Sequence, residues 1–491
     1  MLINRNIRST AERAFLAGVA IFFAVFTSLQ AARFSLIVED KSPVVFPNIK
    51  SEGESILQSA FRARAVGLAK EIGTAGAINQ GDEIILNLFP GAYYTATVDR
   101  VGFNVNGTVI VRGRLNGYPL GYFLASTTGK RSLVSINIPE QERRYRVISE
   151  PLTCTHYLID VDSSLLDNLE NGPSLIPVIS GVPKDKENEQ SKELFAPLEL
   201  GVNDPASIDV MVVYTPAARN WADTYGGGIE NVIAQSIAIS NFVLDNNNTL
   251  ITMPLVHMAE VNYVESGDSY TDVNRLTFVD GYMDEVLNWR NEQAADLVAL
   301  FALVQDVGGL GWLLDRKTGR PNQGFCLVRI QQASSSFVHI HEMGHNMGAH
   351  HHKEQLSYAG PTEWTDWPEN TWSAGWRWVG NDEKLYCSVM TYESGIYFAD
   401  GKTHNRVAFF SDPEINYEGV AAGHPADGDN ARTILEMKHV VAAYRQKSEN
   451  PVLAVTPEYM NFGTDYIGGT FNINNPGSET LNWTIGAVTY N

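Results

Sequence analysis

The sequence predicts an α/β domain, with a mixed sheet and one helix that bears a candidate active site, between two β-rich segments. Three observations support this fold class. Buried strands alternate with helices over residues 205–448, short strands with turns fill residues 33–182, and strands return in residues 449–491. The chain has 491 residues, 44% of them hydrophobic and 19% charged, which is enough apolar material for two or three globular domains.

The formal net charge of the chain is −20, so nucleic acids and anionic membrane surfaces are not expected partners. Some of the carboxylates are candidates for Ca²⁺ binding, but no D-x-[DN]-x-[DN]-G loop supports a calcium site. We expect a soluble, acidic monomer.

Residues 1–32 have the pattern of an export signal peptide. Three arginines within the first 13 residues precede an apolar run, residues 14–29, which is short for a membrane span. The alternative is a retained membrane anchor. We favour cleavage, which predicts a secreted protein with no stable membrane insertion once the signal peptide is removed.

Residues 33–182 are expected to form a β-rich domain. Short runs of strand-forming residues, separated by Gly, Asn and Pro turns, predict strands at 83–89, 93–98, 108–113, 132–138 and 144–148. Residues 183–204 begin with a charged stretch that has no large apolar side chain, which predicts a linker open to activating proteolysis.

Residues 205–448 supply the α/β pattern. Apolar runs predict buried strands at 208–214, 250–264, 296–303 and 325–330. Helical spacing of apolar residues predicts helices at 229–244, 272–293 and 429–445. The glycine-rich residues 308–312 are interpreted as a loop, and no GKS pattern follows that would make them a phosphate-binding loop.

The residues that follow strand 325–330 include the candidate metal ligands and a candidate general base. Ser334–Ser336 offer N-cap oxygens before a helix that contains His341, Glu342 and His345. His341 and His345 project from one helix face one turn apart, which suits two nitrogen ligands on one tetrahedral Zn²⁺. Glu342 is rotated about 100° from His341, where it can act as general base toward a zinc-bound water.

Gly348 and His351 complete the pattern HExxHxxGxxH. Gly348 permits the sharp turn that ends the helix, and the chain then returns to deliver His351 as a third ligand. Three protein ligands leave a fourth position for water, which is typical of catalytic zinc. The alternative is a nonspecific histidine cluster, but we expect His339, His350 and His352 to lie outside the ligand set.

The pattern resembles the signature of the metzincin zinc peptidases. The resemblance extends to residues 387–392, which match the turn beneath the zinc and make Met390 an apolar floor for the imidazoles. It also implies that Tyr392 stabilises the oxyanion, as the corresponding Tyr of astacins and serralysins does. For both residues the alternative is an ordinary core side chain.

About half of the chain, residues 205–447, is similar to bacterial reprolysin-like peptidases, including the peptidyl-Asp metallopeptidase group. The segments that carry this similarity are 208–217, 263–268, 280–284 and 410–413. In reprolysins an Asp usually follows the third His, whereas His352 stands here. The resemblance implies that residues 33–182 are a propeptide and that strand 325–330 is the edge strand that pairs with substrate backbone.

Three cysteines allow one disulfide and leave one thiol. We predict the pair Cys326–Cys387, because both residues lie close to the candidate site along the sequence. Cys154 could place a thiolate on the zinc and displace its water, which would make it a zymogen latch. The alternative for Cys154 is a small, buried, apolar side chain.

Residues 449–491 resemble the opening strands of an Ig-like β-sandwich. A complete sandwich needs roughly 100 residues, so this segment is either partial or packed on the preceding domain.

These patterns predict a secreted zinc endopeptidase, made as a zymogen, that acts on protein or peptide substrates. One alternative is a secreted binding or adhesion module with a relic metal site, and the intact Glu342 argues against it. Another alternative is zinc hydrolysis of a non-peptide amide.

Overall fold

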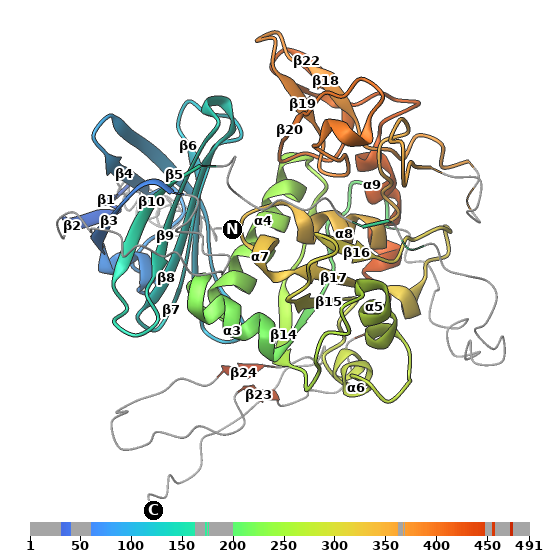
Figure 1. The fold of residues 1–491 in the computed structure, drawn as a ribbon, viewed down its shortest axis with the longest axis horizontal. Helices are drawn as coiled ribbons and strands as arrows, with labels where there is room; N and C mark the ends of the chain where they lie inside the picture. The colour runs from blue at the N-terminus through green and yellow to red at the C-terminus, as the bar shows by residue number, and fades with distance from the viewer. Residues whose placement is uncertain are drawn as a thin grey trace, which may run out of the picture.

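The computed structural model describes residues 31–40, 60–162, 172–173, 175, 200–361, 367, 369–446, 454–456 and 472–474. A β-rich unit and an α/β unit lie side by side within these residues (Figure 1). Residues 1–30 of the predicted signal peptide and residues 183–199 of the predicted linker lie outside the described residues. In the described part of the chain, no helix has both the length and the apolar character needed to cross a membrane.

Ten strands of the β-rich unit form one sheet. They are β1 (Arg33–Ser35), β2 (Ile37–Asp40), β3 (Ala60–Leu68), β4 (Glu83–Phe89), β5 (Ala92–Phe103), β6 (Val109–Leu115), β7 (Tyr122–Thr128), β8 (Arg131–Ile138), β9 (Arg143–Ser149) and β10 (His156–Val161). Their order is β1-β4-β5-β6-β7-β8-β9-β10-β3-β2. The two ends of the sheet meet at Leu36, which donates to Ile85 O at 2.8 Å and accepts from Ala69 N at 3.0 Å. The sheet therefore closes into a barrel.

Side chains on the barrel strands alternate between two cores, as the period of a β-strand requires. Phe123 and Ala125 of β7 belong to the core inside the barrel. Tyr122 and Leu124 of the same strand face outward into the core of the α/β unit. Helix α4 (Ile229–Asn246) lies between the barrel and the rest of the α/β unit (Figure 1). One outer face of the barrel is thus docked on α4.

The α/β unit is built on a five-stranded mixed sheet of order β14-β12-β15-β17-β16. Its strands are β12 (Val210–Tyr214), β14 (Leu255–Glu260), β15 (Leu297–Ala302), β16 (Gly309–Gly311) and β17 (Phe325–Arg329). All neighbours pair in parallel except β16, which is antiparallel to β17 and forms one edge. Every residue of β15 is buried, because separate apolar clusters cover the two faces of the sheet.

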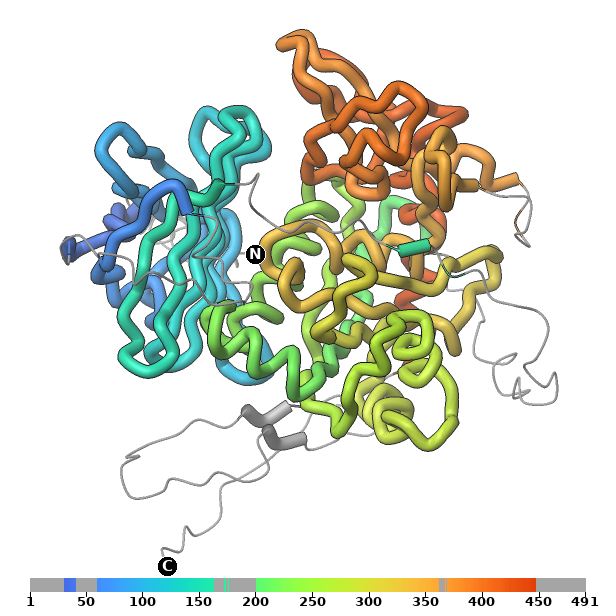
Figure 2. The backbone as a smooth tube through the Cα atoms, in the orientation of Figure 1, coloured from blue at the N-terminus to red at the C-terminus, as the bar shows by residue number. Residues whose placement is uncertain are grey.

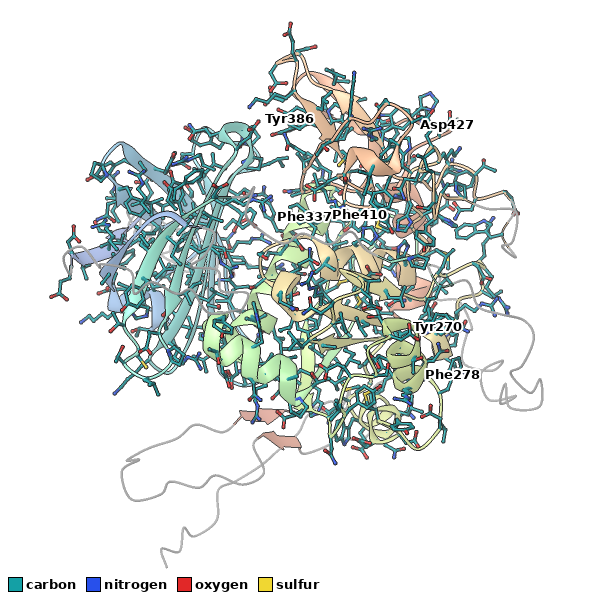
Figure 3. All side chains as sticks on the ribbon, viewed as in Figure 1. Tyr270, Phe278, Phe337, Tyr386, Phe410 and Asp427 are labelled. Carbon is teal, nitrogen blue, oxygen red and sulfur yellow. The ribbon has the colours of Figure 1, made fainter. Side chains whose placement is uncertain are left out.

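The remaining helices of the α/β unit surround this sheet. They are α3 (Pro216–Tyr225), α5 (Ser269–Thr277), α6 (Glu285–Glu292), α7 (Ile330–Ala333), α8 (Val338–Asn346) and α9 (Asn430–Val441). Short 3-10 helices are η2 (Lys70–Gly73), η3 (Pro139–Gln141), η6 (Pro321–Gln323) and η7 (Gly395–Tyr397). Side chains fill the interior of both units (Figure 3). The buried residues Phe337 and Phe410 lie near the centre of the molecule.

Smaller sheets complete the described chain. They contain β11 (Ala206–Ser207) with β13 (Ile251–Thr252), β18 (Arg377–Val379) with β19 (Leu385–Cys387) and β20 (Asn405–Arg406), and β21 (Asp412–Tyr417) with β22 (Val420–Ala422). In the C-terminal segment, β23 (Ala454–Thr456) pairs antiparallel with β24 (Asn472–Asn474). The other residues of the predicted sandwich segment lie outside the described residues.

Four predicted elements differ from the structure. The long strand predicted at 250–264 is two short strands, β13 and β14, which belong to different sheets. The single helix predicted at 272–293 is two helices, because Gly281 has a φ of +92° and Asp284 accepts from its N–H, which forms a turn. The glycine-rich segment 308–312, predicted as a loop, contains the edge strand β16. The strand predicted at 325–330 as the substrate-pairing edge is β17, which lies inside the sheet between β15 and β16.

Candidate metal centre

Three buried histidines meet where helix α8 ends and the chain turns back. His341 and His345 lie one turn apart on α8, and His351 follows the turn at Gly348, whose φ is +90°. Candidate ligand atoms of these three residues all lie within 4.8 Å of one another. The backbone N–H of His350 donates to Asn430 Oδ1 at 3.1 Å. This bond helps fix the returning chain that presents His351.

The outer nitrogen of each imidazole faces a backbone carbonyl. Nδ1 of His341 lies 2.9 Å from Val389 O, Nδ1 of His345 lies 2.8 Å from Ala349 O, and Nδ1 of His351 lies 2.8 Å from Tyr358 O. A carbonyl only accepts hydrogen bonds, so each Nδ1 carries the proton and each Nε2 presents a lone pair. Burial is the largest of the effects that lower the pKa of all three imidazoles, which favours their neutral form.

The three Nε2 lone pairs converge on one point. Nε2 of His351 lies 3.0 Å from Nε2 of His341 and 3.1 Å from Nε2 of His345. Two nitrogens bound to one tetrahedral zinc ion stand about 3.3 Å apart, close to this spacing. Facing lone pairs repel each other, whereas a cation between them is attracted to both. The donor set and its geometry therefore fit a Zn²⁺ ion.

Glu342 lies beside this centre as a fully buried carboxylate. Neither of its oxygens has a hydrogen-bond partner among the described residues. Burial raises the pKa of Glu342 well above its usual value, and the Arg406 guanidinium opposes part of that rise. An unpartnered buried carboxylate costs stability, so it is typical of a functional site rather than of packing.

The glycines of β16 make room for Glu342. A Cβ atom at Gly309 would stand 2.6 Å from Glu342 Oε1, and one at Gly311 would stand 3.0 Å from Oε2. Both positions exclude side chains unless Glu342 moves. The glycine run thus places an edge strand directly against the carboxylate.

Met390 and Tyr392 also lie at the centre. Met390 is fully buried below α8, and a Cβ atom at Gly344 would stand 2.8 Å from its Sδ atom. The ring of Tyr392 lies 4.8 Å from the ring of His351. Its hydroxyl donates to Gly172 O at 2.9 Å.

The other histidines point elsewhere. His339 Nδ1 contacts Ser240 Oγ at 2.9 Å, and His352 Nδ1 accepts from Glu354 N at 3.0 Å. Neither residue, nor His350, belongs to the group of candidate ligands found in the described part of the chain.

The predicted disulfide is wrong. Cys326 and Cys387 are both buried free thiols. Cys326 lies in β17 of the five-stranded sheet, whereas Cys387 ends β19 in a different sheet and donates to His404 O at 3.7 Å. Closeness along the sequence to the candidate site did not bring these two side chains together.

The predicted cysteine latch is also absent from the centre. Cys154 is a free thiol in the turn between β9 and β10, where its N–H donates to Glu150 O at 3.0 Å. It is not among the residues that meet at the three histidines.

Instead, a short piece of the predicted propeptide pairs with β16. Gly172 N donates to Gly309 O at 2.7 Å, Leu175 N donates to Gly311 O at 2.9 Å, and Leu313 N donates to Leu175 O at 2.8 Å. Leu175 forms a parallel bridge with Trp312. In Figure 2 this piece is a short teal tube inside the α/β unit, away from the barrel.

Arg406 is a residue at the site that the sequence patterns did not identify. Its Nε donates to Thr391 O at 3.0 Å, next to Met390. After burial and neighbouring imidazoles, Arg406 is a further cause of the low pKa of His341. A short strand with an Arg carries no sequence motif, so only the fold could reveal this position.

Comparisons with known proteins fit this geometry. Residues 231–352, which include the three histidines, match the family described as Metallo-peptidase family M12B Reprolysin-like. Two relatives from strains of Stenotrophomonas maltophilia, each named peptidyl-Asp metalloendopeptidase, are 28% identical to the chain over 314 and 311 residues. These alignments cover 64% and 63% of this chain, and 68% and 67% of the relatives.

Among solved structures, metalloproteinase-II from Bacteroides fragilis superposes with a TM-score of 0.36 and 12% sequence identity. The superposition covers 57% of this chain and 85% of that protein.

Proposed function

We propose that this zinc metalloendopeptidase of the reprolysin-like M12B metallopeptidases cleaves proteins with His341, His345 and His351 as its zinc ligands. The observation that carries the proposal is the convergence of three Nε2 lone pairs beside a buried carboxylate that has no hydrogen-bond partner among the described residues. When bound, Zn²⁺ supplies a Lewis acid that polarises the scissile carbonyl and acidifies the attacking water. Met390 supports the ligands from below as an apolar floor.

Glu342 is proposed to act as the general base, and Tyr392 as a hydrogen-bond donor to the oxyanion. The carboxylate of Glu342 takes the proton from the attacking water and passes it to the leaving amine. The phenol of Tyr392 donates a hydrogen bond to the developing oxyanion. The contact between Tyr392 and Gly172 O supports this role, since the hydroxyl already binds a peptide carbonyl at this place.

The substrate backbone is proposed to add to β16. An edge strand offers free N–H and C=O groups to an extended peptide, and Gly172 and Leu175 pair with that edge in this structure. The names of the relatives suggest cleavage next to Asp, and we extend that preference to this chain as part of the proposal.

The chain is proposed to be exported and made as a zymogen. Residues 33–182 then act as a propeptide, and a cut within residues 183–204 releases the enzyme. The segment around Gly172 and Leu175 supports this role, because it covers the edge that a substrate needs. We place the latch there rather than at Cys154.

Zinc binding by the full chain tests the ligand assignment. We expect one zinc ion per chain, and His345→Ala should weaken zinc binding by at least about 100-fold, because a whole ligand is lost. His350→Ala is the matched control, since His350 is an equally buried neighbour outside the ligand group. Equilibrium dialysis measures both variants. Equal zinc affinity for His345→Ala and the wild type would refute the assignment.

A further inference from the structure

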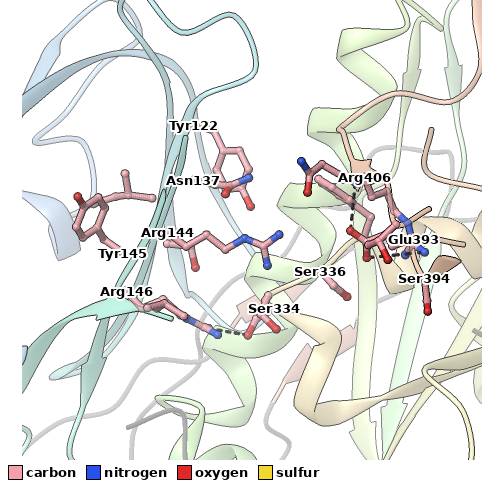
Figure 4. A pocket seen from close by; sticks show the side chains of 17 residues that line it. Tyr122, Asn137, Arg144, Tyr145, Arg146, Ser334, Ser336, Glu393, Ser394 and Arg406 are labelled. Atoms are coloured by element: carbon pink, nitrogen blue, oxygen red, sulfur yellow. Dashed lines mark hydrogen bonds and ion pairs between the residues drawn. The ribbon is translucent and has the colours of Figure 1, made fainter. Parts of the chain in front are cut away.

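A cavity of about 330 Å³ lies between the barrel and the α/β unit, beside the start of α8 (Figure 4). On the α/β side it is lined by residues 334–337, which lead into α8, and by Glu393, Ser394 and Arg406. On the barrel side, Arg144 and Arg146 reach toward it, and Arg146 donates to Ser334 Oγ at 2.9 Å.

The two groups of lining residues on the α/β side, residues 334–337 and residues 393–406, are both next to the metal centre. The N–H of His341 donates to Phe337 O at 2.9 Å, so the first group contacts a candidate ligand. Glu393 follows Tyr392, whose ring packs on His351. A substrate side chain next to the scissile bond would therefore have this cavity within reach.

The cavity is basic in the uncut chain, because its lining residues include three arginines and Glu393 as the single carboxylate. Arg144 and Arg146 belong to β9 of the barrel, so Arg406 and Glu393 are the charged lining residues of the α/β half. Arg406 is therefore the group that an anionic side chain would meet in the processed chain. The barrel closes the cavity in the uncut chain, so the occupant would enter after the barrel is released.

Arg406 is the arginine of the α/β side. Its Nε donates to Thr391 O, and its Nη2 lies 4.0 Å from Glu393 Oε2, which is the outer limit of an ion pair. With the barrel in place, only 7% of the Arg406 side chain is exposed. A carboxylate that reaches this guanidinium would form a charge-assisted, partly desolvated pair, which is stronger than a contact at the surface.

We propose that Arg406 determines specificity, by binding the carboxylate of an acidic side chain next to the scissile bond in the α/β half of this cavity. The proposal rests on the peptidase function above and assigns its Asp preference to one residue. Glu393 orients the guanidinium before the substrate arrives, and Arg144 and Arg146 leave the cavity with the barrel.

The test compares two peptides that differ only by Asp or Asn at one position. The enzyme is the full chain after limited proteolysis within residues 183–204, called the processed chain below. We expect Arg406→Met to lower kcat/KM for the Asp peptide about 10- to 100-fold more than for the Asn peptide. Arg406→Lys should restore part of the preference, because it keeps the charge but loses the fork geometry.

Arg377→Met is the matched control. Arg377 is a similarly buried arginine, which pairs with Asp400 at 3.3 Å, donates to Lys402 O, and lines a different cavity. The ratio of kcat/KM values for the two peptides should be unchanged in this variant. Equal losses for both peptides in Arg406→Met would indicate a purely structural role and overturn the proposal.

A binding measurement separates this proposal from the peptidase function. Calorimetry with the processed Glu342→Gln variant should show tighter binding of the Asp peptide than of the Asn peptide, and Arg406→Met should remove the difference. Cleavage by the processed wild type without preference for Asp would refute the role of Arg406 and leave the peptidase function standing. Failure to cleave any peptide, with the binding preference intact, would refute the function and support the subsite.

Discussion

Replacing Glu342 with Gln is expected to lower kcat/KM of the processed chain by about 10³-fold while zinc remains bound. The amide has nearly the same shape as the carboxylate, so it fits between α8 and the glycines of β16. It cannot accept the proton of the attacking water, and the three histidines are unchanged. Steady-state hydrolysis of a denatured protein and the zinc content of the variant measure the two effects.

Glu354→Gln is the control for this variant. Glu354 is an exposed carboxylate three residues after His351, so its replacement should leave turnover and zinc content at wild-type values. A Glu342→Gln enzyme that keeps more than about a tenth of wild-type activity would refute the general-base role, because such a base contributes at least about 10²-fold.

Replacing Leu175 with Asp is expected to raise the activity of the uncut chain by about 100-fold. Leu175 is buried in the same apolar cluster as Leu310 and Trp312. An unpaired carboxylate there costs several kcal/mol, which shifts the segment off β16, and each 1.4 kcal/mol changes the open fraction tenfold. Hydrolysis of the denatured protein by purified uncut variants, with cleavage of the linker excluded by mass spectrometry, measures the effect.

Gly172→Val provides an independent variant at the other end of the paired segment. A Cβ atom at Gly172 would stand 2.9 Å from Leu310 Cδ1 and 3.1 Å from Gly309 O, so a larger side chain should also displace the segment. Cys154→Ser should leave the uncut chain latent, because Cys154 lies away from the histidines. Activation by Cys154→Ser alone would place the latch at the cysteine instead.

The three histidines proposed as zinc ligands could be predicted from the sequence because their geometry is local. A helix fixes the relation between His341 and His345, and a glycine with positive φ turns the chain so that His351 returns after six residues. The mixed sheet with its helices fits a metzincin catalytic domain, and the alternating apolar runs predicted most of its strands. These features depend on neighbours along the chain.

The remaining features depend on contacts between distant segments. Nothing local in the sequence shows that the glycines of β16 form an edge strand. Glycine is needed there because the carboxylate of Glu342 lies against this strand and leaves no room for a side chain. The Cys326–Cys387 disulfide was wrongly predicted for the same reason. The two cysteines lie in strands of different sheets, and the sequence near each cysteine does not show this. Arg406 and Gly172 likewise reach the site from strands and segments far from the motif.

The central claim, zinc-dependent peptide hydrolysis at the three histidines, is tested most directly by one measurement. It is the hydrolysis of a denatured protein by the processed chain, with and without a zinc chelator, beside the uncut chain. We expect cleavage by the processed chain that the chelator abolishes and added Zn²⁺ restores, and little cleavage by the uncut chain. Absence of cleavage by a folded, zinc-loaded, processed chain would contradict the claim and favour a binding module.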